Sequence, residues 1–396
     1  MSSLGGLALI LGAGFGFVSA AAISACSSQS RSDIPVGSAS LGAPFGDSAR
    51  APTGINPEDE ESFDALLSQL QDKRVVFIGE THDRYDHHLN QLAIVRGLRE
   101  RGVDLAVGME FFQEPFQPHL DRYVAGEIGE KALLKGTQYY ERWRYDFRHY
   151  RDILAYAQDQ GIPLVALNAP TELVRKVSQG GLSALSSEER GRLPADLSPP
   201  DAAYKERLRP VYEMHGQLSA DRLQRFAEVQ MLWDEHMARV ARDYLDANPG
   251  KALVILAGSG HVAYQDAIPG RLTRMTGVQT AVVATGRHEG FGDADVDFVL
   301  AERDIALPEP GRVGMMLARN DRGVTVTELP PASPAAEAGF RPGDLVLSIA
   351  GEPVQGMDDV RLALLDRAPG EQVWVEVVPG GAPATDSRQG RVLTLL

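Results

Sequence analysis

Two segments of the chain carry a histidine three residues after a glycine: Gly79-Glu80-Thr81-His82 and Gly258-Ser259-Gly260-His261. Because glycine lets the backbone turn sharply, an imidazole at this spacing can face back over the end of a preceding strand. Two imidazoles with a carboxylate, Glu110 or Glu80, suit a divalent metal ion with open coordination positions. Such an ion lowers the pKa of a bound water to about 7 and so generates a nucleophile. For either motif alone, a hydrogen-bonded buried histidine is the alternative interpretation.

These polar residues follow apolar runs with strand character. The predicted strands are Val75–Ile78, Val103–Met109, Ile162–Leu167, Ala252–Leu256 and Thr280–Ala284. Short apolar runs of this kind indicate strands buried on both faces. Helical segments separate the runs, which predicts an α/β fold with a mostly parallel sheet flanked by helices. Ligands bind at the carboxyl edge of such sheets. We therefore expect His82 and His261 to lie close together, with Glu80 and Glu110 beside them and Asn168 on the same edge.

Long helices are predicted over Tyr139–Gln160 and Ser219–Ala247. The first contains Trp143, Tyr145 and several other tyrosines and arginines, which suits either cover for a flat aromatic ligand with carboxylates or an amphipathic lid helix. In the second, the positions of Gln230, Trp233, Asp234 and Met237 share one helix face, as a packing stripe or as support for the site. The pair His87-His88 opens a further helix, either as a ligand-binding pair or as a solvated one.

Composition excludes several classes of function. The 396-residue chain has a net charge of −15, which argues against nucleic acid as a partner because phosphate binding needs a basic surface. Its one cysteine, Cys26, leaves His, Met or Tyr as ligands for a haem iron. No Gly-x-Ser-x-Gly elbow, phosphate-binding loop or dinucleotide fingerprint occurs, which disfavours a serine hydrolase and a nucleotide-binding enzyme.

The amino-terminal segment is an apolar, Gly- and Ala-rich run from Leu4 to Ile23, followed by Cys26. This resembles a bacterial lipoprotein signal over residues 1–26, with lipid attached to Cys26. Ser27 after the cysteine then implies a cell-envelope location, at the periplasmic face of the outer membrane. A simple membrane anchor is the alternative. Residues 27–55 are rich in Ser, Gly, Ala and Pro and predict a flexible tether.

Residues 56–305 resemble the ChaN family of haem-binding uptake proteins, within a superfamily that includes Tiki metalloproteases and erythromycin esterases. The matching segments occur in the expected order: Gly79–Asp83 with His88 and Gln91, Gly108–Glu110, Trp143–Tyr145, Ala166–Asn168, Gln230–Met237, Gly258–Val262 and Ile268–Arg271. The resemblance implies a central site, catalytic in a hydrolase or metal-binding: Glu80, His82, Glu110 and His261. It implies ligand-binding residues around this site: His88, Tyr145, Asn168, Gln230 and Asp234.

Residues 306–396 resemble a bacterial PDZ domain, a small and mainly β fold. The matching segments are Val313–Met316, Gly323–Val326, Ser333–Gly339 and Arg341–Gly351. The resemblance implies that a peptide carboxylate meets backbone N–H groups of the loop formed by Val313, Gly314, Met315 and Met316, while the peptide pairs with the adjacent strand. A degenerate PDZ fold that only packs on its neighbour is the alternative.

Two functions therefore remain open. One is an envelope protein that binds haem or an iron complex during uptake and docks a partner through its PDZ domain. The other is a hydrolase that uses a divalent ion (Mn, Co or Zn) at its His/Glu centre. The metal-competent residues favour the hydrolase, and the family resemblance favours haem.

Overall fold

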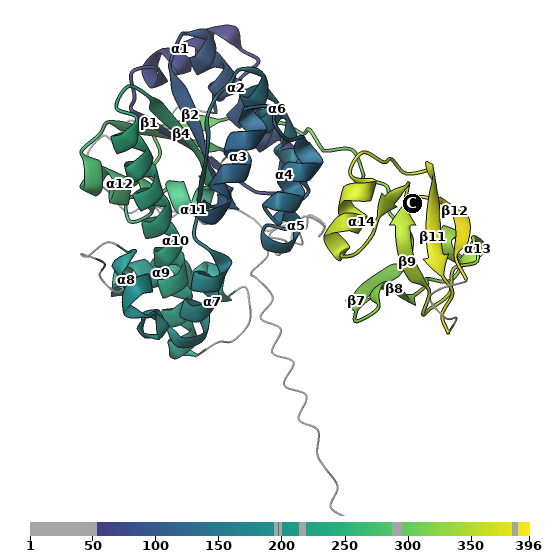
Figure 1. The fold of residues 1–396 in the computed structure, drawn as a ribbon. Coiled ribbons are helices and arrows are strands. Elements are labelled where there is room, and N and C mark those ends of the chain that lie inside the picture. The colour runs from purple at the N-terminus through teal and green to yellow at the C-terminus, as the bar shows by residue number, and fades with distance from the viewer. Residues whose placement is uncertain (1–53, 194–196, 198–199, 214–218, 287–294, 382–386) are drawn as a thin grey trace, which may run out of the picture.

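The computed structural model describes residues 54–193, 197, 200–213, 219–286, 295–381 and 387–396 (Figure 1). The predicted signal sequence, Cys26 and nearly all of the predicted tether lie outside these residues. Ile55, predicted as the end of the tether, forms a parallel bridge with Leu300 of the first domain. Within the described part of the chain, no helix is both long and apolar enough to cross a membrane.

The first domain is built on a six-stranded parallel sheet with the strand order β3-β2-β4-β1-β5-β6. The strands are β1 Val75–Glu80, β2 Leu105–Gln113, β3 Leu164–Asn168, β4 Ala252–Gly258, β5 Thr280–Thr285 and β6 Phe298–Leu300. The predicted α/β class and the five predicted strands are confirmed. The short strand β6 was not predicted, because three residues carry too little pattern to reveal a strand.

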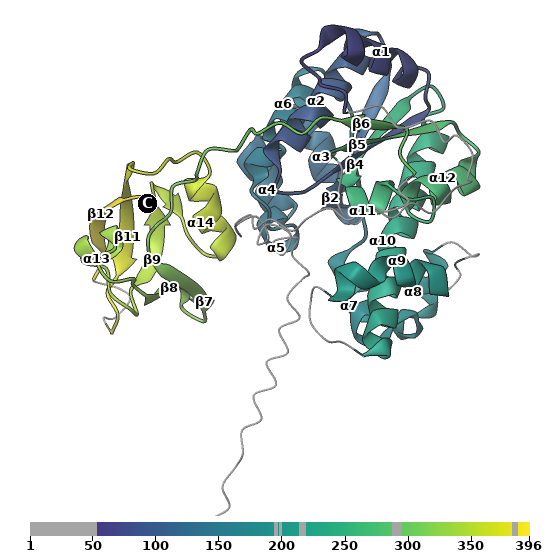
Figure 2. The same cartoon turned by 180° about the vertical axis from the view of Figure 1, so that it is seen from behind.

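Helices cover both faces of this sheet (Figures 1 and 2). One face packs against α1 Glu60–Leu70, α2 Tyr85–Glu100, α3 Gln117–Val124, α4 Glu130–Gly136 and α6 Arg151–Asp159. The other packs against α10 Ala220–Ala247 and α12 Ile268–Thr276, and the short α11 Ser259–Val262 follows β4. Strand β1 serves both cores, since Val76 and Ile78 face the first and Val75 and Phe77 face the second. This two-sided burial explains its uninterrupted apolar sequence.

A helical layer lies against the amino-terminal half of α10. It consists of α7 Thr171–Gly180, η5 Leu182–Ala184, α8 Ser187–Gly191 and α9 Ala202–Glu213. Buried residues of α7 and α10 share one apolar cluster, and those of α9 and α10 share another. The prediction of one long helix over Ser219–Ala247 is confirmed by α10.

The prediction of one long helix over Tyr139–Gln160 is wrong. The segment divides into α5 Tyr139–Arg142, η4 Phe147–His149 and α6. Arg144 has a φ of +74°, in the left-handed region that a right-handed helix cannot contain. Gln138, immediately before α5, is also left-handed with a φ of +52°. The aromatic residues of this segment are therefore divided between a one-turn helix and a loop.

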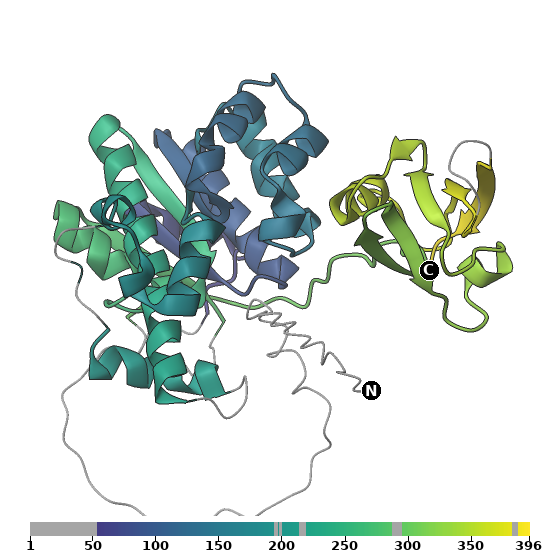
Figure 3. The same ribbon diagram turned by 60° about the horizontal axis from the view of Figure 1, so that its bottom comes forward.

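The second domain is a small antiparallel sheet with its own apolar core and the strand order β12-β11-β9-β8-β7, to which β10 is attached through β9. Its elements are β7 Met316–Asn320, β8 Gly323–Glu328, α13 Pro334–Glu337, β9 Leu345–Ile349, β10 Glu352–Pro353, α14 Met357–Leu364, β11 Gln372–Val378 and β12 Gln389–Thr394. Figure 3 shows the linker after β6 running from the first domain to the second. The predicted mainly β fold is confirmed.

Candidate metal and ligand site

The strand order brings the predicted site residues to one edge of the sheet. Asn168 ends β3, Glu110 lies where β2 leaves its regular pairing with β4, and Glu80 ends β1. His261 lies in α11, directly after β4, which is the strand between β2 and β1. Residues distant in sequence are neighbours here because β4 inserts between β1 and β2.

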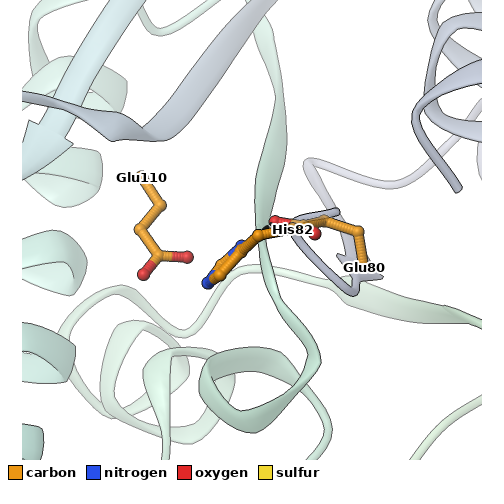
Figure 4. Close-up of side chains that lie close together, drawn as sticks. All are labelled: Glu80, His82 and Glu110. Atoms are coloured by element: carbon orange, nitrogen blue, oxygen red, sulfur yellow. Dashed lines mark hydrogen bonds and ion pairs between the residues drawn. The ribbon is translucent and has the colours of Figure 1, made fainter. Parts of the chain in front are cut away.

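Glu80, His82 and Glu110 form the centre of the site. His82 Nδ1 donates a hydrogen bond of 2.5 Å to Glu80 Oε1, and the His82 ring lies between the two carboxylates (Figure 4). One ligand atom from each of the three residues lies within 4.8 Å of the others. Glu110 Oε2 is held by the backbone N–H of Gly258 at 2.7 Å. Both glutamates are buried, whereas 18% of the His82 side chain is exposed.

His261 completes the site from the opposite side. Its Nδ1 donates a 2.6 Å hydrogen bond to Asp234 Oδ1 on α10, and its Nε2 lies 3.6 Å from Glu110 Oε1. The second Asp234 oxygen accepts from the Tyr204 hydroxyl at 3.1 Å. Asp234 thus fixes both the tautomer and the orientation of His261, as carboxylates do for metal-binding histidines. His261 thus lies beside Glu110, one of the three central residues, as the shared strand edge predicts.

The other predicted ligand residues support this centre. His88 is fully buried, bonded through Nδ1 to Gln91 at 3.0 Å and through Nε2 to the His82 carbonyl at 3.3 Å. Asn168 Nδ2 donates to the Glu110 carbonyl at 2.8 Å. Because His88 and its neighbour His87 are buried, the reading of a solvated pair is wrong. Gln230 is half-buried on α10, one turn before Asp234.

An aromatic wall formed by Trp143 and Tyr145 lies beside His82. The ring centroids of Trp143 and Tyr145 lie 4.8 and 4.9 Å from that of His82. Trp143 Nε1 donates to the Tyr150 hydroxyl at 3.1 Å, and this hydroxyl donates to the His82 carbonyl at 3.4 Å. The loop between α5 and η4 therefore supplies the rings that border the site.

Charges in the centre are mutually stabilising. Although burial alone lowers it, the Glu80 carboxylate raises the pKa of His82 to about 9. Burial likewise opposes the charge on His261, but Glu110 and Asp234 raise its pKa above the ordinary value. Burial alone would raise the pKa of Glu80, and the facing imidazoles, His82 first, lower it instead. His82 is consequently protonated at neutral pH in the metal-free protein.

The residues of the centre fit a divalent metal ion. Glu80 Oε2 is buried and has no hydrogen-bond partner among the described residues. His88 Nε2 lies 3.9 Å from this oxygen, beyond hydrogen-bond distance. A buried carboxylate oxygen without a hydrogen bond is costly and calls for a ligand or ion. Two carboxylates and an imidazole, with a second imidazole alongside, are donors that Mn, Co, Zn or Fe accept.

A cavity of about 700 Å³ begins one residue beyond His82, at Asp83. Arg84, Arg148 and His149 line it, together with the linker that leads to the second domain. Carboxylates also line this cavity, and Arg84 and Arg148 are already bonded to Asp86 and Asp146, so an anionic ligand would have to compete with these carboxylates. The site thus combines a metal-competent centre, an aromatic wall and a polar cavity.

Gly258 has no side chain and so leaves room for the His82 ring, which gives a test of the site geometry. A Cβ at Gly258 would lie 2.8 Å from His82 Cε1, whereas a Cβ at Gly260 would meet nothing within 4 Å. Gly258→Ala is therefore expected to displace the imidazole and to weaken metal binding roughly tenfold or more, with little change in melting temperature. Gly260→Ala is the matched control. Equal affinities in calorimetric metal titrations of both variants would contradict the geometry.

Comparison with known proteins assigns the first domain to a family. The model of the family described as "Haem-binding uptake, Tiki superfamily, ChaN" matches residues 66–272, more than half of the chain. The chain belongs to this ChaN family. A PDZ-domain model matches residues 325–379. The protein thus joins a ChaN-like domain from a haem-binding family to a PDZ domain.

Individual relatives resemble only parts of the chain. RETICULATA-RELATED 5, a chloroplastic protein of Arabidopsis thaliana, is 23% identical over 56% of this chain and 32% of its own length. Putative protease Do-like 14 of the same plant is 36% identical over 20% of this chain and 18% of its own length. The chain therefore spans about a third or less of these two relatives. The solved ChaN structure of Campylobacter jejuni with cofacial haem is 17% identical, with a TM-score of 0.48, over 60% of this chain and 90% of that one.

One residue of the ChaN-like site was missed at the sequence level. Tyr204 lies on α9 and donates a hydrogen bond to Asp234. No spacing relates Tyr204 to the strand ends, so only the packing of α9 on α10 reveals this contact. By contrast, the two Gly-x-x-His motifs and Glu110 were identifiable because strand ends carry a sequence signal.

Proposed function

We propose that the ChaN-like domain binds haem, or another iron complex, as part of iron uptake in the cell envelope. The observation that carries this proposal is the partly exposed His82 ring beside Trp143 and Tyr145, next to a cavity lined by both arginines and carboxylates. A flat ring system can stack on such a wall. Its carboxylates would then compete with Asp86 for Arg84 or with Asp146 for Arg148.

A specific feature favours a second candidate, a metal-dependent hydrolase. Glu80, His82 and Glu110 converge around an unpartnered buried oxygen, and His261 is oriented by Asp234. In this role a bound divalent ion would supply a water with a pKa of about 7. The protein would contribute the ligand carboxylates, and His261 Nε2 would lie where it can hold or release a proton beside Glu110.

One pair of measurements separates these candidates. Purified protein is titrated with haem while the Soret band is followed, and its metal content is determined by elemental analysis. Haem uptake is expected to produce a Soret shift that weakens in Tyr145→Phe or His82→Ala. A stoichiometric Mn, Co or Zn ion that is lost in His82→Ala and His261→Ala, without any haem binding, would reject the uptake proposal. Haem binding without bound metal would reject the hydrolase.

The PDZ domain is proposed to bind the carboxyl terminus of a partner. Gly314 has a φ of +62°, and the N–H groups of Gly314 and Met315 donate to no backbone acceptor in the described residues. Met315 is buried in the domain core, whereas 57% of Met316 is exposed on the edge strand β7. Peptides with a free apolar carboxyl terminus are expected to bind at least roughly tenfold more tightly than their amidated forms, because the amide removes a charge-assisted hydrogen bond. Equal affinities in fluorescence anisotropy would reject this mode.

The envelope location rests on the sequence before the first domain. The apolar run Leu4–Ile23 ends shortly before Cys26, the single cysteine of the chain. If Cys26 carries lipid, Cys26→Ser is expected to move the protein from the membrane fraction to the soluble fraction and to abolish labelling with a radioactive fatty acid. Ser28→Cys in the Cys26→Ser background is the control for position. Unchanged fractionation and labelling would reject the lipoprotein.

A further inference from the structure

Helix α14 of the PDZ domain is shared by two apolar cores. Val360 and Ala363 pack into the core of the PDZ domain. Leu362, on another side of the helix, and Leu365, just after its end, are buried in the large core of the ChaN-like domain. The two domains are therefore joined by packing as well as by the linker, and α14 lies beside α4 and α5 (Figures 1 and 2).

Charged pairs surround this contact. On α4, Lys135 Nζ lies 2.8 Å from Asp359, and Lys131 Nζ lies 3.1 Å from Glu352 of β10. Beyond α14, Asp366 lies 2.7 Å from a nitrogen of Arg151 on α6. Each basic side chain comes from the ChaN-like domain and each acidic one from the PDZ domain. This complementarity fixes the orientation of the contact.

The contact reaches α5, which leads to the metal and ligand site. The Arg361 guanidinium of α14 lies 5.3 Å from the ring centroid of Tyr140 and donates to the Tyr140 carbonyl at 3.4 Å. Only three and five residues further along the chain are Trp143 and Tyr145, whose rings contact His82. A single turn of helix thus connects the PDZ contact to the aromatic wall.

Two features indicate that the segment around α5 can adopt a second conformation. The left-handed residues Gln138 and Arg144 lie on either side of α5, and such backbone strain is characteristic of switch segments. A cavity of about 250 Å³, lined by Lys131, Leu362 and Arg367, leaves the domain contact incompletely packed. Because Leu362 and Leu365 are packed in the core of the ChaN-like domain, a shift of α14 would be transmitted to that domain.

We propose that peptide binding to the PDZ domain alters the metal and ligand site through the contact between α14 and α5. The inference rests on the peptide binding proposed above. A peptide paired with the edge strand β7 would lie next to α14, since these two elements are in contact. Any shift of α14 would change the position of Arg361 on Tyr140, and with it the wall formed by Trp143 and Tyr145. Linkage requires the reverse effect, so a ligand at His82 would change peptide affinity by the same factor.

Hydrogen–deuterium exchange of the full chain tests this coupling without any ligand at the metal site. The probe is a library-selected decapeptide with a free apolar carboxyl terminus, and the amidated decapeptide is its control. Saturating peptide is expected to protect β7 and to change exchange in residues 138–145 by about fivefold or more, the lower range of typical coupling. Protection of β7 with unchanged exchange in 138–145 would overturn the coupling alone. Unprotected β7 would reject the proposed peptide binding, and the coupling with it.

A charge-reversed variant provides a second measurement that needs no peptide. Lys131→Glu/Lys135→Glu places like charges opposite Glu352 and Asp359 and is expected to raise exchange in residues 138–145 by about fivefold or more. The matched control, Arg122→Glu/Lys251→Glu, reverses two basic residues that pair within the ChaN-like domain and should leave this segment unchanged. Identical exchange in both variants would overturn the coupling.

Discussion

Replacement of Glu80 by glutamine is expected to abolish binding of Mn²⁺, Co²⁺ and Zn²⁺ while the fold is retained. Glutamine preserves the volume of the buried side chain but removes the charge of the carboxylate. Glu80 Oε2 has no hydrogen-bond partner among the described residues, whereas Oε1 accepts the hydrogen bond of His82, so a neutral amide keeps an acceptor for His82 but loses the charge that an ion would use. Loss of this ligand should weaken metal binding by about 100-fold or more, since mutation of residues that only support metal ligands already lowers metal affinity 10–100-fold.

Calorimetric titration measures this affinity, and thermal unfolding gives an independent readout. Metal at about 100 times its dissociation constant should stabilise the wild-type protein by about 2.7 kcal/mol, and a chelator should remove this gain. Glu80→Gln should show no chelator-dependent change. Glu172→Gln is the control, because Glu172 is an exposed carboxylate near the same sheet edge, bonded to Arg142. Metal affinity within tenfold of the wild type in Glu80→Gln would exclude Glu80 as a ligand.

The site residues that could be predicted from the sequence are those that follow the apolar strand segments. Val75–Ile78 is buried on both faces, so its sequence is uniformly apolar and the polar residues after it stand out. The same contrast identified Glu110, which lies in β2 just beyond its pairing with β4, and His261 after β4. Their proximity followed from one general rule, that the carboxyl ends of parallel strands share an edge.

The remaining features depend on tertiary contacts that leave no local pattern. The order β2-β4-β1, which places β4 between strands that precede it in sequence, cannot be read from periodicity. Tyr204 reaches Asp234 only through the packing of α9 on α10. The break in the predicted Tyr139–Gln160 helix arises at Arg144, whose left-handed backbone is held by surrounding contacts against its own preference. The contact between α14 and α5 likewise joins two segments whose sequences give no sign that they pack on each other.

Glu235→Ala is expected to destabilise the ChaN-like domain by about 3–5 kcal/mol, the largest stability effect that the structure indicates. Glu235 lies on α10 with 3% of its side chain exposed, and it pairs with Arg271 and Arg274 of α12. Truncation removes the ion-pair partner of Arg271, itself 11% exposed, and leaves Asp234 as the remaining carboxylate that offsets its charge between the two helices that cover one face of the sheet. The adjacent Asp234 would also lose rigidity, so the orientation of His261 should become less well defined as the stability falls.

Urea unfolding followed by circular dichroism measures this effect. The matched control is Glu188→Ala, which removes an exposed carboxylate of α8 that is paired with Arg192 and should cost about 0–1 kcal/mol. Glu235→Leu/Arg271→Met removes both partners and should recover most of the loss, because a buried ion pair can be replaced by apolar side chains of similar size. If Glu235→Ala costs no more than the control, Arg271 finds another partner or water, and the α10–α12 contact is held by its apolar residues alone.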